Sequence, residues 1–419
     1  MDHKSAARYR QFRTGRAFQA EGQSKITLAT YVMSLIYLDN QASTPVDPRV
    51  LEVMAPLWTE SFGNPHSGEH FAGWAAMKAV ERAAEQIAST MGATPNEVVF
   101  TSGATEANNL ALLGAALGRR EGGRRRIVIS PIEHKSVLEV ALHLSDKANW
   151  EVAYAPVNSI GRVDLDGLER LMDSQTLLVS IGAVNGEIGT VQPIAEIGEL
   201  AHKAGALMHS DATQAACSGP LSVIYDYCDL ISLSAHKCYG PKGIGSLIVK
   251  APVRERISPV MFGGGQQGGL RPGTIPAPLA VGFGESLALA QTNLSDERDK
   301  ISELRERLAS KLSATCDGFS VVGPKGLRHA GNLNARFEGV QAKSILAGLQ
   351  PRVAASTGSA CASGVEEPSH VLTAIGMSWQ EASECIRFSV GRFNTQDQID
   401  EAVELISKAV SRFRAVEAL

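Results

Sequence analysis

Apolar and polar positions alternate in blocks between about residues 98 and 250. Between the strand-like runs, as at 107–117, apolar residues recur every three or four positions, which predicts helices. Several of the runs are almost continuously apolar, which is typical of strands buried on both faces of a parallel sheet. We therefore predict an α/β fold with a helix-covered, mainly parallel seven-stranded sheet. The predicted strands lie at 98–100, 127–130, 151–157, 177–184, 207–210, 230–233 and 246–249.

The pattern changes beyond residue 292. A long charged helix is predicted over about 293–315, and Thr395 with Gln398 has the spacing of a capping box that opens a last helix. Strand-like runs separate the two helices, at 319–322, 333–337, 353–356 and 385–390. We therefore predict a large domain over 47–292 and a smaller α+β domain made of 35–46 together with 293–419.

Residues 1–34 form an N-terminal extension of different composition. They hold six basic residues against two acidic ones and show no clear apolar period. A basic, acid-poor leader is one form of organelle transit peptide. We favour instead a dispensable tail, or an upstream start codon with Met33 as the real initiator, and expect the segment to be poorly ordered.

Composition and charge narrow the class of protein. Of the 419 residues 44% are apolar and 20% charged, as in soluble globular proteins, and the length suits two domains. A net charge of −4 gives no basic field for nucleic acid or a membrane surface, and no apolar run approaches the roughly 18 residues of a membrane span. Six scattered cysteines without a Cys-x-x-Cys pair fit a reducing compartment. We expect a cytoplasmic protein in which five of these cysteines are core residues.

Polar segments follow several predicted strands, where open α/β sheets bind ligands. Residues 101–106 (Thr-Ser-Gly-Ala-Thr-Glu) open a helix, whose free N–H groups and dipole suit a phosphate. Asp211 ends an apolar strand and is costly to bury without a cation; a protonated pyridine nitrogen would be such a partner. An ordinary helix-capping aspartate explains this segment equally well.

Two further segments suggest the same chemistry. Lys237 follows the next strand, with Ser234 and His236 just before it, and could form a Schiff base beside a bound phosphate. His134, after another strand, could stack on a flat cofactor. A solvated loop lysine and a capping or core histidine are the ordinary alternatives. The order of the four segments, each on its own strand, indicates a site for pyridoxal 5'-phosphate.

These residues resemble the cysteine desulfurases of the NifS/IscS type, within the class V aminotransferases. The likeness runs from about residue 37 to 393. It implies the type I fold of pyridoxal-phosphate-dependent transferases and a homodimer. The motifs that carry it are Tyr-Leu-Asp-Asn at 37–40, Phe-Gly-Asn-Pro at 62–65, Ser-Gly-Ala-Thr-Glu at 102–106, Glu-His-Lys at 133–135, Asn-Gly-Glu-Ile-Gly at 185–189, Asp-Ala-Thr-Gln at 211–214 and His-Lys at 236–237 followed by Tyr-Gly-Pro-Lys-Gly at 239–243.

The resemblance implies a role for each matching residue. Lys237 would bind the cofactor covalently and later move the α-proton of the substrate. Asp211 would pair with the pyridine nitrogen, Gln214 would contact the ring hydroxyl, and His134 would stack on the ring and help with proton transfer. The phosphate would be bound by Ala104, Thr105, Ser234 and His236, and by Thr274 of the partner subunit. Asn185, also beside the cofactor, and Arg387 would bind the substrate carboxylate, which a guanidinium fits in geometry.

The segment at 356–364 (Ser-Thr-Gly-Ser-Ala-Cys-Ala-Ser-Gly) resembles the mobile cysteine loop of the family. The resemblance implies that the Cys361 thiolate attacks the sulfur of L-cysteine, holds it as a persulfide and passes it to an acceptor protein. The pathway served would be iron–sulfur assembly, tRNA thiolation or DNA sulfur modification. We expect no resident metal; Cys361 would at most ligate an iron–sulfur cluster transiently.

Two departures from the family bear on these expectations. Ala183 and Gly186 stand where relatives commonly have histidine and asparagine, which would alter substrate fit or rate. The chain also ends soon after its last predicted helix, whereas housekeeping members have an extension that engages the iron–sulfur scaffold protein, which favours a dedicated desulfurase. The alternatives are a selenocysteine lyase or another class V aminotransferase, and a non-catalytic sulfur-relay or scaffold subunit.

Overall fold

A seven-stranded sheet forms the centre of the structure, a computed structural model that describes residues 35–118, 123–358 and 369–417. The strand order is β2-β8-β7-β6-β5-β3-β4. β8 is antiparallel to both of its neighbours, whereas β3 to β7 pair in parallel. The predicted fold class and strand count are confirmed. The strands are β2 (Val98–Thr101), β3 (Arg126–Ile129), β4 (Glu151–Tyr154), β5 (Thr176–Ser180), β6 (Leu207–Asp211), β7 (Leu230–Ser234) and β8 (Gly245–Val249).

Burial explains why the apolar runs became strands. Every residue of β5, β7 and β8 is buried, whereas the edge strand β4 has no buried residue. The predicted run at 177–184 is longer than β5, which ends at Ser180. Gly182 follows, and its N–H donates to the Glu133 side chain at 2.9 Å, while the N–H of Ala183 still donates to the carbonyl of Asp211 in β6 at 3.0 Å.

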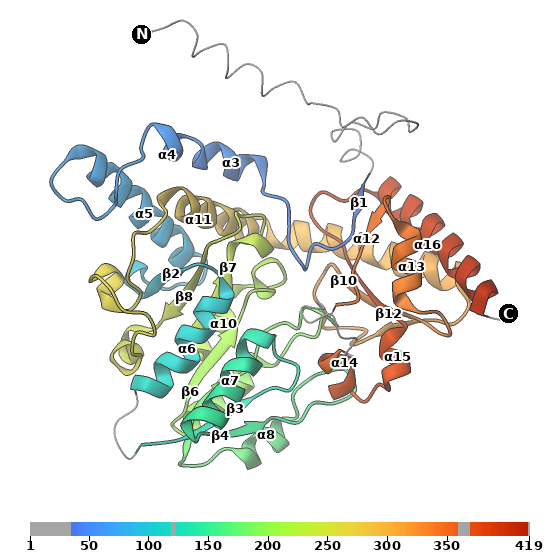
Figure 1. Cartoon of the computed structure of the whole chain (residues 1–419), viewed down its shortest axis with the longest axis horizontal. Helices are drawn as coiled ribbons and strands as arrows, with labels where there is room; N and C mark the ends of the chain where they lie inside the picture. The colour runs from blue at the N-terminus through green and yellow to red at the C-terminus, as the bar shows by residue number, and fades with distance from the viewer. Residues whose placement is uncertain (1–34, 119–122, 359–368, 418–419) are drawn as a thin grey trace, which may run out of the picture.

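Helices cover both faces of this sheet (Figure 1). Alternate strand residues point to opposite faces, so that Ile127 and Leu178 pack with α6 and α7 while Val128 and Val179 pack in the other cluster. The first layer holds α6 (Ala104–Gly118) and α7 (Lys135–Ala148). The second cluster includes residues of α5 (Phe71–Ser89), α8 (Leu165–Leu171), α9 (Ile194–Lys203), α10 (Leu221–Tyr227) and α11 (Ala277–Thr292), with α3 (Pro48–Met54) and α4 (Pro56–Thr59) beside α11.

A separate apolar cluster lies at the right of Figure 1. It joins apolar side chains from between Ile301 and Val410 with Ile36 and Leu38 from the other end of the chain. This packing supports the predicted division into two domains, which stays a prediction. The elements are β1 (Ile36–Tyr37) paired with β11 (Val353–Ala354), the antiparallel sheet of β9 (Phe319–Val322), β10 (Asn332–Phe337) and β12 (Cys385–Ser389), and the helices α12 (Leu294–Thr315), α13 (Ala342–Leu349), α14 (His370–Ala374), α15 (Trp379–Ser383) and α16 (Gln396–Glu417).

The predicted start of the last helix is confirmed by its hydrogen bonds. The Thr395 hydroxyl accepts the N–H of Gln398, and the Gln398 side chain accepts the N–H of Thr395, both at 3.3 Å. This reciprocal pair is the capping box that the sequence predicted for the last helix.

Other predictions have mixed outcomes. Cys228, Cys238, Cys316 and Cys385 are buried as expected, whereas Cys217 is only partly buried. Burial raises the pKa of Cys238 to about 11, so this thiol stays protonated at neutral pH. Across the described ranges, no helix combines the length and the apolar character needed to cross a membrane. The predictions for residues 1–34 and for Cys361 fall outside the described residues.

Candidate active site

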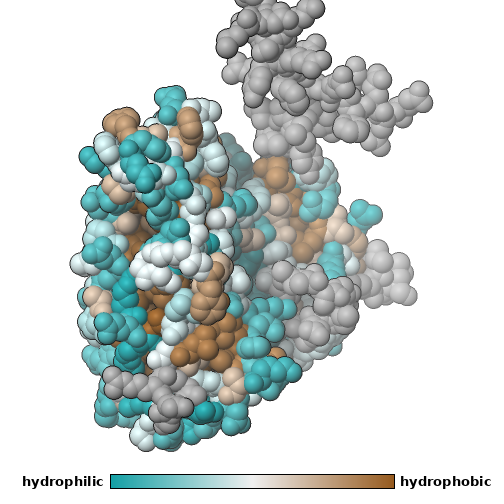
Figure 2. Space-filling model, turned by 60° about the vertical axis from the view of Figure 1, so that its left-hand side comes forward, coloured by the Kyte–Doolittle hydropathy of each residue, from teal (hydrophilic) through white to brown (hydrophobic). Residues whose placement is uncertain are grey.

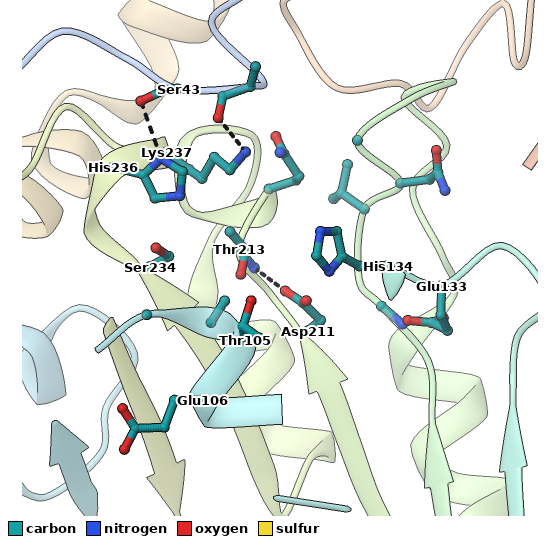
Figure 3. A pocket seen from close by; sticks show the side chains of 18 of the residues that line it. Ser43, Thr105, Glu106, Glu133, His134, Asp211, Thr213, Ser234, His236 and Lys237 are labelled. Atoms are coloured by element: carbon teal, nitrogen blue, oxygen red, sulfur yellow. Dashed lines mark hydrogen bonds between the residues drawn. The ribbon is translucent and has the colours of Figure 1, made fainter. Parts of the chain in front are cut away.

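A cavity of about 600 Å³ opens where β5, β6 and β7 end and where α6 begins. Figure 3 shows side chains from these separate elements pointing into it. Thr274 and Arg387 do not line it in this single chain, and Cys361 lies outside the described residues. Nine of the predicted site residues line the cavity: Ala104, Thr105, His134, Asn185, Asp211, Gln214, Ser234, His236 and Lys237.

Lys237 lies in the short turn after β7, and its side chain is held by the segment between β1 and α3. Its Nζ donates hydrogen bonds to the carbonyl oxygens of Gln41 (2.6 Å) and Ala42 (2.8 Å). Burial lowers the pKa of Lys237 to about 8, the Arg387 charge adds to the effect, and Asp211 opposes it. The alternative of a freely solvated loop lysine is therefore wrong. A half-buried amine of lowered pKa is suited to covalent catalysis.

Asp211 is the last residue of β6 and presents a carboxylate to the cavity (Figure 3). Oδ1 accepts the N–H of Thr213 at 3.0 Å, and Oδ2 accepts Nδ2 of Asn108 at 2.8 Å. In the described part of the chain Asp211 forms no salt bridge. A carboxylate held by neutral donors, with its charge left unpaired, fits a cationic ring nitrogen in the cavity.

His134 caps α7 and also lines the cavity. Its Nδ1 accepts the N–H of Ser136 at 3.1 Å and lies 2.8 Å from the Ser136 hydroxyl. The two interpretations of this histidine, capping residue and cofactor contact, are therefore compatible. The cap fixes the ring while its other edge stays available to a ligand.

One end of the cavity has the donors that a phosphate needs. α6 begins at Ala104, and the first N–H groups of a helix have no partner within it. The hydroxyls of Thr105 and Ser234 face the same space. His236 Nδ1 lies 3.2 Å from the Ser43 hydroxyl, and burial, with the charges of Lys237 and Lys242, lowers the pKa of His236 to about 4. A neutral His236 can then donate from Nε2.

Glu106 is the last residue of this turn and lines the cavity next to Thr105 (Figure 3). It forms a two-bond ion pair with Arg271, with Nε to Oε1 at 2.7 Å and Nη2 to Oε2 at 3.2 Å. Glu106 also accepts the N–H of Ser102 at 2.6 Å. The pair ties the phosphate turn to the loop that carries the exposed Thr274. Thr274 is thus on a fixed loop, and its role toward a partner subunit stays a prediction.

Arg387 lies behind the cavity in β12 and is 7% exposed. Its guanidinium donates to Asp39 Oδ1 (2.8 Å), to Ser356 Oγ (2.9 Å) and to the carbonyl of Gly186 (3.0 Å). A substrate carboxylate would have to share this guanidinium with Asp39, a contact that no sequence pattern predicted. The predicted role of Arg387 stays untested.

Asn185 serves the backbone as well as the cavity. Its Nδ2 donates to the carbonyl of Ile132 at 2.9 Å, and its Oδ1 accepts the N–H groups of Glu187 and Ile188. The amide nitrogen carries two hydrogens, so one remains for a ligand. Next to it, a Cβ on Gly186 would approach the Gln214 side chain to 3.1 Å. The departure at position 186 therefore leaves room for a residue predicted to contact the cofactor.

Several residues at the site were missed by the sequence reasoning. Gln41, Ala42 and Ser43 come from beside the Tyr-Leu-Asp-Asn motif, but no spacing connects them with residues almost 200 positions away. Glu133 is fully enclosed, and burial, opposed by the Gly182 N–H and aided by the Asp211 charge, raises its pKa to about 8. Its position beside His134 was the one available signal.

The lowered pKa of Lys237 predicts how the apoprotein should take up pyridoxal phosphate. Only the neutral amine attacks the aldehyde, so the rate of capture should rise with pH and level off above about pH 8. A lysine with the ordinary value of 10.5 would still be mostly protonated there. The measurement is the growth of the cofactor absorbance at a series of pH values. A rate that climbs undiminished to pH 10 would contradict the lowered pKa.

Comparison with known proteins places the chain in a family. The family model of class V aminotransferases matches residues 36–402, and the chain belongs to this family, whose members use pyridoxal phosphate. The protein named cysteine desulfurase IscS from Rickettsia bellii (strain OSU 85-389) is 42% identical over 92% of this chain and 93% of its own length. A probable mitochondrial cysteine desulfurase from Dictyostelium discoideum is also 42% identical, over 92% of this chain and 85% of its own.

A solved structure gives the same result for the fold. The structure named NifS-like protein superposes with a TM-score of 0.83 at 35% sequence identity. The match covers 90% of this chain and 99% of the other. The predicted type I fold and the predicted family are therefore confirmed.

Proposed function

We propose that this chain is a pyridoxal-phosphate-dependent cysteine desulfurase, which converts L-cysteine to L-alanine and holds the released sulfur as a persulfide on Cys361. The observation that carries the proposal is the meeting of Lys237, Asp211 and His134 at one cavity. The family and the named desulfurases similar to this chain support the same activity. The alternatives gain no comparable support.

The residues around the cavity fit the cofactor in chemistry. The first turn of α6, with Thr105, Ser234 and His236, would hold the phosphate, and Asp211 would hold the ring nitrogen. Gln214 would contact the ring hydroxyl; its Nε2 also donates to the carbonyl of Gln41 at 3.0 Å. When bound, pyridoxal phosphate supplies an electron sink that makes the α-proton of an amino acid acidic.

The side chains of this chain do the remaining work. Lys237 would anchor the cofactor, and its amine would move the α-proton of the substrate as a base whose pKa lies near working pH. His134 stacks on the ring and assists proton transfer. Arg387 and Asn185 hold the substrate carboxylate and thereby select an amino acid in one orientation.

Sulfur transfer needs a thiolate, which we assign to Cys361. The Cys361 sulfur attacks the substrate sulfur and forms an S–S bond, while the bond between Cβ and that sulfur breaks and its electron pair stays with carbon. Protonation at Cβ then completes L-alanine, and the persulfide stays on the enzyme. One L-cysteine and the thiol of Cys361 therefore react to give one L-alanine and one persulfide. An acceptor protein removes the terminal sulfur afterwards.

A second copy of the chain would complete the site. The surface around α4 and α5, turned forward in Figure 2, exposes large hydrophobic side chains, as does the adjoining loop after β8. Such a patch is typical of a protein interface. It supports a homodimer in which Thr274 reaches the phosphate of the partner's site. Residues of this surface include Trp58 (58% exposed), Phe62 (73%), Phe71 (78%) and Phe262 (85%).

The remaining expectations belong to the same proposal. We place the enzyme in the cytoplasm, although its relatives include a mitochondrial protein as well as bacterial ones. A net charge of −4 supports the expectation that it binds no nucleic acid directly. The identity of the acceptor would follow from trapping proteins that receive sulfur from wild type but not from Cys361→Ser.

Incubation of the purified holoprotein with L-cysteine and a reducing thiol tests the function. We expect alanine and sulfide in equal amounts. Transfer of the amino group to a keto acid, without sulfide, would instead identify an aminotransferase, and strong preference for L-selenocysteine would identify a selenocysteine lyase. A colourless protein with neither activity would favour the scaffold subunit.

A further inference from the structure

Four side chains form a continuous row of hydrogen bonds behind the cavity. Asp211 Oδ2 accepts from Asn108 Nδ2 at 2.8 Å, the same Nδ2 donates to Ser136 Oγ at 2.8 Å, and Ser136 Oγ lies 2.8 Å from His134 Nδ1. Asn108 belongs to α6 and Ser136 to the first turn of α7. Neither residue lines the cavity. The row therefore connects two cofactor residues, Asp211 and His134, through two residues outside the site.

The orientation of the Asn108 amide is fixed by its neighbours. Asn108 is fully buried, and both hydrogens of its nitrogen are used, one of them toward a carboxylate. Its Oδ1 has no hydrogen-bond partner within the described residues. A flipped amide would place that oxygen against the Asp211 carboxylate, a repulsive contact between two acceptors. The charge-assisted bond outweighs the one acceptor left without a partner.

This orientation determines where His134 carries its proton. Because Ser136 Oγ accepts from Asn108, its own hydrogen is available to His134 Nδ1. The backbone N–H of Ser136 also points at Nδ1, at 3.1 Å. A ring nitrogen that accepts from two donors carries no hydrogen, so the hydrogen of the neutral ring is on Nε2.

We propose that Asn108 and Ser136 are positioning residues that fix the Asp211 carboxylate and hold the His134 proton on Nε2, the nitrogen left available to the cavity. This inference deepens the proposed function and rests on it. His134 then presents an N–H donor to the reacting groups rather than a lone pair. Asp211 and His134 are also coupled, because a shift at either end of the row changes the bonds of Asn108 or Ser136.

Loss of the Ser136 hydroxyl should affect turnover more than substrate binding. For Ser136→Ala we expect kcat to fall about tenfold with KM nearly unchanged, by analogy with other residues that orient a ligand-binding histidine. Ser136→Thr keeps the hydroxyl and should restore most of the activity. Ser145→Ala is the matched control, because Ser145 lies on the same helix but is exposed.

Asn108→Ala should add a second effect, weaker binding of pyridoxal phosphate. Asp211 loses a donor, so we expect the dissociation constant of the cofactor, from titration of the apoprotein, to rise about tenfold. In the double variant with Ser136→Ala, kcat should stay close to that of Asn108→Ala alone, because the two residues act in one row. If the fall in kcat of the double variant equals the product of the falls in the two single variants, the two residues act independently. That result would overturn the proposal.

The position of the His134 proton has a direct readout. Nitrogen-15 NMR of histidine-labelled protein, with the His134 signals assigned by their loss in His134→Gln, should show the Nε2–H form in wild type. Ser136→Ala should show a smaller share of this form, because only the backbone N–H of residue 136 then still points at Nδ1. An Nδ1–H form in wild type would refute the inference, as would Ser136→Ala equal to wild type in both kcat and spectrum. Wild type that makes no alanine and sulfide would refute the proposed function instead, and the NMR result would still stand.

Discussion

Lys237→Ala is expected to abolish the conversion of L-cysteine, with kcat lowered at least about 1,000-fold. The variant loses both the covalent anchor of the cofactor and the base that acts on the α-proton. Its fold should persist, because within the described residues the Lys237 side chain forms two hydrogen bonds, to the carbonyls of Gln41 and Ala42. The measurements are alanine and sulfide release, with the cofactor absorbance before and after borohydride.

A matched surface variant makes this result specific. Lys203→Ala removes an exposed lysine that pairs with Glu169 on the surface, and it should leave turnover unchanged. Folding of both variants is compared by circular dichroism. A Lys237→Ala protein that still binds the cofactor covalently and produces alanine would show that another lysine does this work.

Cys361→Ala should lower sulfide release at least about 1,000-fold while the protein keeps its yellow cofactor. None of the cavity residues is altered, so L-cysteine should still bind and change the absorbance of the holoprotein. The loss concerns the thiolate that takes the sulfur, not the cofactor site. Cysteine turnover and absorbance are measured on the same sample.

Cys228→Ala provides the control for removal of a thiol. Cys228 is a buried core residue, so its loss should cost about 1 kcal/mol of stability and leave kcat unchanged. If Cys361→Ala consumes L-cysteine as fast as wild type, Cys361 takes no part in the reaction. The chain then catalyses another reaction of the class V family, such as transamination. The assignment of sulfur transfer to Cys361 would then be wrong.

Local patterns in the sequence were enough to predict the framework of the protein. The predicted runs became β6, β7 and β8 within one residue of the predicted bounds, because strands buried on both faces are rich in apolar residues. The capping box at Thr395 was equally local. The order of the strands was not predicted, and neither was the direction of β8, which runs antiparallel to both of its neighbours.

From the residues alone, without the family resemblance, a site residue was predictable where it came at or just after the end of an apolar strand. Lys237, Asp211 and His134 were found in this way. Lys237 donates to backbone carbonyls, and Arg387 pairs with Asp39. These partners belong to one segment that lies more than 190 residues away in the sequence. Figure 1 shows this segment passing from β1 at the right to α3 at the left. Such contacts depend on tertiary packing, which the periodic pattern of apolar residues does not predict.

Asn108 was missed for a different reason. It follows the phosphate turn by one helical turn and looks like any polar residue of a buried helix. Its two donors become informative only when Asp211 and Ser136 are seen on either side of it. A single sequence gives the residue type but not the direction of its amide.

Location of the lysine that carries the cofactor tests the central claim most directly. Lys237 and Lys242 both line the cavity, so the two can compete for the aldehyde. Holoprotein reduced with borohydride, digested and analysed by mass spectrometry should carry the phosphopyridoxyl group on Lys237. The same group on Lys242, or on no lysine of the chain, would contradict the account.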